Sequence, residues 1–298
     1  MRFVHCSDIH LLDLSGTRPH ELFNKRITGA VNLLLKRRRR HDDTRFEAIK
    51  RAAESLGVDR LVVTGDLTNL SLPSEFRNAA RSLEQTSLPV TVIPGNHDAY
   101  VGSAYEAGLF ETHMGQFMEG ERPTDAPYPF VNRTHEGMAF IGVTSAVPTP
   151  PMLATGEVGA EQLAALELVL SECAAEGRAR VVLIHHPPVE GASKPKHDLI
   201  DRAAFAKVVA RCGAELILHG HEHKEMHTTL EGPGGSVPVF GVPSGTSVDP
   251  RAGREGGFAL FEFGDGVFTR TRYAWGDSGF TPVGALAEFS LRPQPPAP

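Results

Sequence analysis

Short apolar, β-branched runs recur along the first three quarters of the chain, and helix-like stretches separate them. The runs cover residues 2–6, 60–63, 90–93, 139–143, 181–184 and 216–218. Between them, apolar residues stand three and four positions apart, as in Phe46, Ile49 and Ala53, which predicts amphipathic helices. Alternating strands and helices predict an α/β fold whose buried strands lead into loops at their carboxyl ends.

The last quarter of the chain, from Met226 onward, has a different pattern. Segments such as V-P-V-F-G-V and F-A-L-F-E-F alternate with Gly and Pro turns, which predicts strands and no helix. The Pro-rich tail, residues 291–298, is predicted to be disordered. Because no repeat or linker interrupts the chain, we expect one domain over residues 1–290, with a basic helical insertion at about 20–41.

The composition is that of a soluble globular protein, with 41% hydrophobic and 22% charged residues. The start M-R-F-V-H-C-S-D lacks the apolar region of a signal peptide, and no apolar run is as long as a membrane span. Cys6, Cys173 and Cys212 are too scattered for a disulfide framework or a thiolate metal site. We therefore expect a cytoplasmic protein, and the net charge of -6 disfavours a surface built throughout for nucleic acid.

Potential metal ligands stand just past the apolar runs. Loops at one edge of such a sheet converge, so these side chains are expected to meet in one crevice. Each motif alone is explained equally well by turn or capping chemistry. Five such motifs occur in order, however, and they offer Asp, His and Asn but no Cys. This set of ligands indicates a hydrolytic Mn, Fe, Zn or Co site. The residues are Asp8, His10, Asp66, Asn96, His97, Asp98, His185, His186, His221 and His223.

Together the motifs D-x-H, G-D, G-N-H-D, H-x-P and G-H-x-H resemble those of the calcineurin-like metallophosphoesterase superfamily. The resemblance implies a four-layer α/β/β/α sandwich of two mixed β-sheets and a pair of divalent metal ions, drawn from Mn, Fe, Zn or Co. It implies that His97 is the active-site acid and that Asp98 holds its ring. It assigns one ion to Asp8, His10, Asp66 and His223, and the other to Asp66, Asn96, His185 and His221, with Asp66 as the bridge.

The remaining histidines of these motifs are expected to lie beside the ligands. Neighbouring strand residues point to opposite faces, so only one of His185 and His186 can face the ions. The H-x-P pattern of the family selects His185, which leaves His186 for the other face of the sheet or the rim of the pocket. His219 is predicted to stay in its strand as a packing or supporting residue.

The resemblance also implies an activity. Two metals some 3.5–4 Å apart can hold a bridging hydroxide in line with a phosphate. Purple acid phosphatases have a ferric-iron Tyr ligand where this chain has Asn69, which favours a pair of divalent ions. Residues 144–170 resemble the bacterial class III cyclic nucleotide phosphodiesterase group. We therefore expect hydrolysis of a small phosphodiester, with cyclic nucleotides first, by attack of a metal-bridging hydroxide.

Two alternatives stay open. One is a lipid-linked phosphate substrate, as in the calcineurin-like hydrolases that split UDP-diacylglucosamine at the membrane surface. The other is a non-catalytic scaffold, as in the retromer coat, which the presence of His97 and all seven predicted ligands disfavours. The sequence does not determine the native metals, the physiological substrate or the oligomeric state.

Residues 25–40 hold seven Lys and Arg residues and no Asp or Glu. As a helix, this segment has an apolar stripe formed by Ile27, Ala30, Val31 and Leu34. The rest of the helix surface is basic, with Lys25, Arg26, Lys36, Arg39 and Arg40. A packed helix with a solvated basic face explains the pattern as well as the sharper hypothesis does. That hypothesis is peripheral contact of residues 20–41 with an anionic membrane, or a cap over an anionic lipid-linked substrate. A nucleic-acid arm is disfavoured because no aromatic residues interleave the basic ones.

Overall fold

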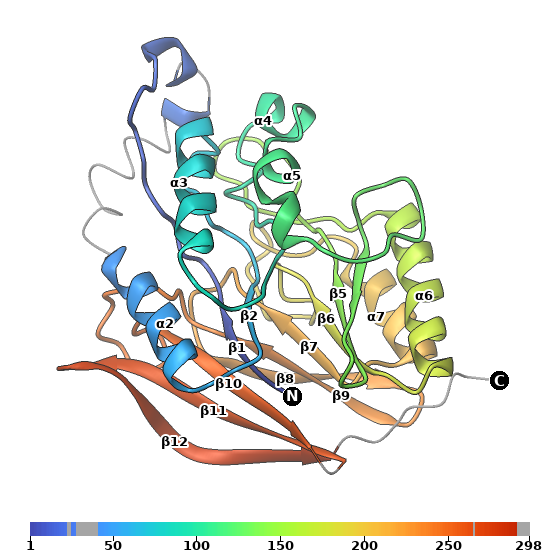
Figure 1. Ribbon diagram of the computed structural model, residues 1–298. Helices are drawn as coiled ribbons and strands as arrows, with labels where there is room; N and C mark the ends of the chain where they lie inside the picture. Colours follow the sequence, from blue (N-terminus) through green and yellow to red (C-terminus); the bar gives the residue numbers. More distant parts are fainter. Residues whose placement is uncertain (23–24, 28–40, 265, 291–298) are drawn as a thin grey trace.

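The computed structural model describes residues 1–22, 25–27, 41–264 and 266–290. Two six-stranded mixed β-sheets lie at its centre (Figure 1). The first has the order β12-β11-β10-β1-β2-β3 and the second β4-β5-β6-β7-β9-β8. The strands of the first sheet are β1 (Arg2–Cys6), β2 (Arg60–Val63), β3 (Val90–Val92), β10 (Gly257–Gly264), β11 (Val267–Gly276) and β12 (Gly279–Ser290). Those of the second are β4 (Phe130–Arg133), β5 (Met138–Gly142), β6 (Ala179–Leu183), β7 (Leu216–His219), β8 (Met226–Gly232) and β9 (Gly235–Gly241).

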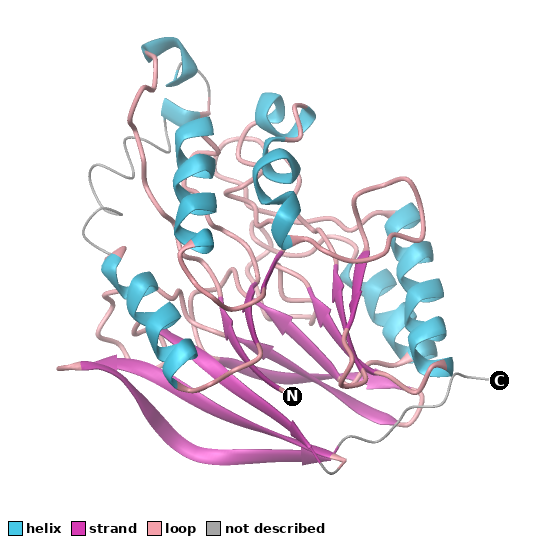
Figure 2. Ribbon diagram, in the orientation of Figure 1, coloured by secondary structure: helices cyan, strands magenta, loops and turns pink. Residues whose placement is uncertain are grey.

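Helices flank the sheets, as Figure 2 shows. Phe46 and Phe76, from α2 and α3, belong to the same buried cluster as β1 and β2, whereas α6 and α7 supply apolar residues to a second cluster with β5, β6 and β7. This arrangement confirms the predicted four-layer α/β/β/α sandwich. The helices are α2 (Thr44–Ser55), α3 (Pro73–Glu84), α4 (Gly102–Glu106), α5 (Leu109–Met114), α6 (Ala160–Ala175) and α7 (Arg202–Cys212), with short 3-10 turns η1 (Pro19–Leu22) and η3 (Gly115–Phe117).

The core between the sheets follows the two-residue period of the strands. In β6, Val181 and Leu183 face the core shared with the first sheet, while Val182 packs with the outer helices. Across the two sheets, the rings of Phe3 and Phe140 meet edge to face, with centroids 5.1 Å apart. A strand buried on both faces needs apolar residues throughout, which is why these strands read as continuous runs.

Parallel pairing brings the carboxyl ends of the central strands to one edge. β1 pairs in parallel with β2, and Cys6 lies opposite Val63. β6 pairs in parallel with β7, and Leu183 lies opposite Leu218. The loops that follow these four strands therefore leave the two sheets side by side, and they hold most of the predicted ligands.

The predicted strands are present, and β8 to β12 confirm the strand-rich end of the chain, without a helix in the described residues from Met226 onward. The pattern missed β4, a short antiparallel strand paired with β5. The tail at 291–298 and most of the predicted insertion, residues 23–24 and 28–40, lie outside the described residues. In the parts that are described, no helix combines the length and apolar character needed to cross a membrane.

Candidate metal centre

An uncommon backbone conformation marks the site. In the described chain, seven non-glycine residues have a positive φ, and five of them are predicted ligands. This left-handed region costs an L-residue about 1–2 kcal/mol, so such residues cluster where function requires a particular side chain. The five are Asp8 (55°), His10 (53°), Asp66 (55°), His221 (72°) and His223 (48°).

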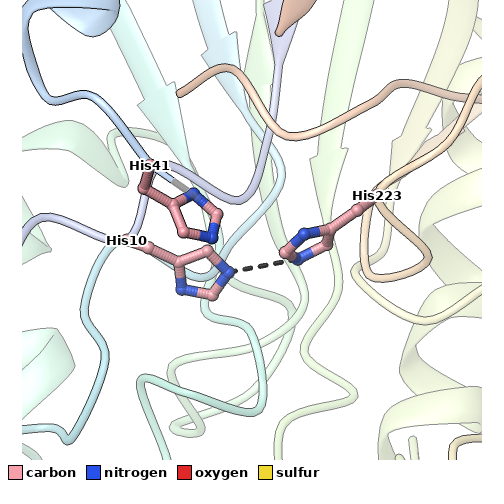
Figure 3. Close-up of side chains that lie close together, drawn as sticks. All are labelled: His10, His41 and His223. Carbon is pink, nitrogen blue, oxygen red and sulfur yellow. Dashed lines mark hydrogen bonds between the residues drawn. The ribbon is translucent and has the colours of Figure 1, made fainter. Parts of the chain in front are cut away.

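The first group of side chains is formed by Asp8, His10, Asp66 and His223, whose ligand atoms all lie within 4.8 Å of one another. His10 Nε2 is 3.1 Å from His223 Nε2, and the two rings face each other in Figure 3. His223 Nε2 is 3.1 Å from Asp8 Oδ1, and His10 Nε2 is 3.7 Å from Asp66 Oδ2. These four residues are the ones that the family resemblance assigned to the first ion.

The protonation pattern of this group suits a cation. His10 Nδ1 lies 3.2 Å from the carbonyl oxygen of Thr68, which can only accept, so Nδ1 donates and Nε2 carries a lone pair. Asp8 Oδ1 is buried without a hydrogen-bond partner, because its contact with His223 lacks hydrogen-bond geometry. A buried carboxylate oxygen without a donor is costly unless a cation satisfies it.

The second group is formed by Asn96, His185 and His221. Asn96 Oδ1 is 3.2 Å from His185 Nε2 and 2.9 Å from His221 Nδ1. The opposite ring nitrogens face carbonyl oxygens: His185 Nδ1 is 2.7 Å from Thr64 O, and His221 Nε2 is 2.9 Å from His197 O. In their neutral forms both rings turn a lone pair toward the amide oxygen, which gives three acceptors that can ligate one metal ion.

Asp66 lies between the two groups. Its Oδ2 faces His10, whereas its Oδ1 is 3.5 Å from His185 Nε2 and accepts a hydrogen bond from the backbone N–H of His97 at 2.7 Å. Burial alone would raise the pKa of Asp66, but His185 and His97 lower it well below its usual range, so it is a carboxylate. A residue that bridges two ions needs two such oxygens.

The buried carboxylates attract positive charge to this point. Burial by itself lowers the pKa of His185, yet Asp66 and Asp8 outweigh burial and raise that pKa to about 9. For His221 burial dominates and its pKa lies well below the usual value, so the ring is neutral and able to ligate. The donor set thus fits divalent metal ions in type and charge, and a bound ion would displace the proton of His185.

His97 and Asp98 have different hydrogen-bond partners in the structure. His97 Nδ1 lies 2.7 Å from the carbonyl oxygen of Asn69, and its ring stacks on Tyr100 with centroids 5.4 Å apart. The carboxylate of Asp98 accepts backbone N–H groups of Gly95 and of residues 67–68 instead. That Asp98 holds the His97 ring stays a prediction; the described hydrogen bonds of the Asp98 carboxylate serve to fix the backbone around it.

His186 and His219 lie beside the ligands, as expected, and are engaged elsewhere. His186 Nδ1 is 2.7 Å from Ser145 Oγ and its Nε2 is 3.2 Å from Ala154 O, while burial lowers its pKa to about 3. Its ring lies 4.3 Å from that of His221, which it supports. Burial lowers the pKa of His219 to about 4, and its Nδ1 contacts the carbonyl of Gly220 at 3.0 Å.

Sequence motifs missed one histidine at the centre, His41. Its ring centroid is 4.9 Å from that of His10 and 5.8 Å from that of His223 (Figure 3). It belongs to no ligand motif, and the sequence feature that could have pointed to it was its position at the end of the basic insertion.

Two described residues of the insertion depart from the faces that were assigned to them, and the rest of the predicted stripe lies outside the described residues. Arg26, assigned to a basic face, is buried and donates to the carbonyls of Leu70 and Ser71 at 2.8 and 2.7 Å. Ile27, assigned to the apolar stripe, is 45% exposed. Lys25 lies 4.5 Å from the ring centre of Tyr100. This end of the insertion is therefore held against the loop that follows Asp66, and the other assigned residues lie outside the described chain.

The two-sheet fold is shared with solved structures of metal-dependent phosphatases. Over 98% of this chain and 99% of the other, the structure is similar to a dimetal phosphatase from Danio rerio, with a TM-score of 0.63 and 13% identity. It is also similar to the purple acid phosphatase PPD1 from yellow lupin, with a TM-score of 0.62 and 13% identity over 97% of this chain and 53% of that one. At these identities the likeness shows the fold.

Residues 1–225 match the family profile described as calcineurin-like phosphoesterase, and the chain belongs to that family. A probable cyclic nucleotide phosphodiesterase of Psychrobacter sp. (strain PRwf-1) is 26% identical over 213 residues, 68% of this chain. The 3',5'-cyclic adenosine monophosphate phosphodiesterase CpdA of Haemophilus influenzae is 26% identical over 176 residues, 58% of this chain. The matched segments span 57% and 58% of these two relatives.

Proposed function

We propose that this protein is a dinuclear-metal phosphoesterase that hydrolyses a phosphodiester of the 3',5'-cyclic nucleotide type. The observation that carries the proposal is the position of Asp66, whose two oxygens face two separate groups of ligand atoms. Two divalent ions bound there, of Mn, Fe, Zn or Co, supply Lewis acidity and a nucleophile from water at neutral pH.

The side chains have distinct tasks in this reaction. Asp8 and Asp66 bring two negative charges to a centre of otherwise neutral ligands, so two divalent ions leave it positive and suited to an anionic phosphodiester. His97 keeps its Nδ1 on the Asn69 carbonyl, which turns Nε2 toward the crevice. As an imidazolium, His97 carries a second proton on Nε2 and donates it to the leaving oxygen, after which the ring is neutral; such proton transfer is worth roughly 10²–10⁴-fold in rate.

The cyclic nucleotide preference rests on two supports. Residues 144–170 resemble the class III phosphodiesterase group, and two relatives at 26% identity carry cyclic nucleotide phosphodiesterase names. The lipid-linked alternative would need an apolar groove beside the ligands. The hollow that reaches Asp98, about 390 Å³ in volume and lined by Tyr105 and Tyr128 among others, includes no predicted ligand in its walls. The resemblance of residues 144–170 and the names of the two relatives favour the small phosphodiester over the lipid.

The test is hydrolysis of bis-p-nitrophenyl phosphate and of cyclic AMP by the full chain with Mn²⁺. Asn96→Ala and His97→Ala are each expected to lower kcat/KM by at least roughly 10²-fold. His135→Ala, which changes an exposed histidine in the β4–β5 turn, is the matched control and should leave the rate unchanged. Equal rates in all four proteins would refute this mechanism, and no hydrolysis with any divalent metal would refute the proposal and favour a scaffold.

A further inference from the structure

His41 is fixed to the same loop that supports the first ligand group. Its backbone forms an isolated antiparallel bridge with Ser247, and the N–H of the next residue, Asp42, donates to the carbonyl of Thr246 at 2.9 Å. The hydroxyl of Ser244 in this loop donates to the carbonyl of Asp8 at 2.6 Å. The backbone that places His41 is thus tied directly to a predicted ligand.

The hydrogen bonds around His41 assign its tautomer. Its Nδ1 lies 2.9 Å from Thr246 Oγ1 and 3.4 Å from Ser244 Oγ. Each hydroxyl already gives its one proton to a backbone carbonyl, that of Ile9 at 2.8 Å and that of Asp8. Both oxygens therefore accept at His41, so Nδ1 carries the proton and Nε2 of the neutral ring carries a lone pair.

The position of that ring matches a ligand position. One nitrogen each from His10, His41 and His223 lie within 4.8 Å of one another. Two imidazole nitrogens at about 2.0–2.1 Å on opposite sides of one ion are about 4.2 Å apart, so three nitrogens at this spacing can close on a single ion with small side-chain movements. Figure 3 shows His41 and His10 side by side, both facing His223.

We propose that His41 is a further ligand of the ion held by Asp8, His10, Asp66 and His223, an inference that rests on the proposed dinuclear centre. As a neutral ligand it leaves the charge of the centre unchanged. It adds a donor to one ion only, so the two ions differ in coordination number and in affinity. The ion next to His41 is the tighter one.

The experiment is a titration of the metal-free full chain with Co²⁺, followed by calorimetry and by visible absorption. The wild type should bind two ions. His41→Ala should weaken one of them by about 10–100-fold and change the visible spectrum, because the loss of a nitrogen ligand alters the coordination number of that ion. His41→Gln provides a second variant in case the alanine protein does not fold, and His135→Ala is the control.

The outcomes separate the two proposals. If the wild type binds no Co²⁺, the dinuclear centre itself is refuted. If the wild type binds two ions and both His41 variants keep its affinities and spectrum, His41 is not a ligand and only the present inference is overturned. Thr246→Val removes the hydroxyl at Nδ1 but keeps the imidazole, so it should retain more of the wild-type spectrum than His41→Ala does. The same spectrum in both would assign His41 a supporting role and overturn the inference.

Discussion

Gly220 precedes the ligand loop of the second sheet, and we predict that Gly220→Ala disrupts the candidate centre although no ligand is replaced. A Cβ atom at this position would lie 1.9 Å from Ser7 Oγ and 2.5 Å from Asp8 Oδ2. Carbon normally keeps roughly 3.5 Å from such atoms, so one side must move by about 1–1.5 Å. Ser7 and Asp8 are both fully buried, which leaves no open space for the movement.

The displaced side chain is one the centre depends on. Asp8 Oδ2 accepts a hydrogen bond from the backbone N–H of His221 at 3.0 Å, so moving this carboxylate disturbs both ligand groups. Overpacking of this kind costs about 1–3 kcal/mol, which lowers the midpoint of thermal unfolding by a few degrees in a chain of this size. A shift of about 1 Å in a catalytic group costs roughly 10²-fold in rate.

Urea unfolding of the metal-free protein, Co²⁺ affinity and hydrolysis of bis-p-nitrophenyl phosphate measure the three effects separately. Gly115→Ala is the matched control: its φ is -52°, and an added Cβ would meet nothing within 4 Å. The control should change stability by less than about 1 kcal/mol. If Gly220→Ala kept the stability and metal affinity of the control, the close approach of Gly220 to Asp8 would not matter and the reasoning would fail.

Three further predictions concern charge and metal. Glu215→Gln should cost about 3–5 kcal/mol in urea unfolding, because it leaves the buried Arg180 guanidinium, 2.8 Å from the Glu215 carboxylate, without its counter-ion; Asp249→Asn, in an exposed pair, should cost less than about 1 kcal/mol. Mn²⁺ at 100-fold over its Kd should stabilise the wild type by about 2.7 kcal/mol and Asp66→Asn far less, which thermal unfolding with and without the metal checks. Burial raises the pKa of Glu75 from 4.5 to about 7, so the folded protein keeps a proton there that the unfolded chain releases. Stability from this group is present below about pH 4.5 and falls by about 3 kcal/mol as the pH rises to 7; urea unfolding of Glu75→Gln should lack this loss, and an identical pH profile would contradict the assignment.

The sequence predicts the central strands and the candidate ligands for the same physical reason. A strand buried on both faces must be apolar throughout, so β1, β2, β6 and β7 stand out as short continuous runs. Parallel pairing then fixes which loops share an edge, and polar residues in those loops are forced together. The local sequence pattern is sufficient for these two predictions because they require only the positions of the strands, and not the contacts of individual side chains.

Other features depend on contacts that local pattern does not contain. β4 is short, and only its first two residues are buried, so no periodic signal marks it. His41 reaches the centre through Thr246, which is 205 positions away in the chain. Asp98 adjoins His97 in sequence, yet the backbone donors of another loop take its carboxylate. For His41 and Asp98 the decisive partner is remote in sequence.

Hydrogen bonds between the ligand loops support the strained backbone of the ligands. Hydrogen bonds run from one ligand loop to the next: the Asp8 N–H donates to Gly65 O at 3.0 Å, the His10 N–H to Asp66 O at 2.9 Å, and the Gly220 N–H to His185 O at 3.1 Å. Each positive φ costs about 1–2 kcal/mol, and these bonds stabilise the loops against relaxation of that strain. Because the loops hold one another in place, they lose little conformational entropy when a metal ion binds. Less of the binding free energy is then needed to order the ligands, which raises the affinity for the ion.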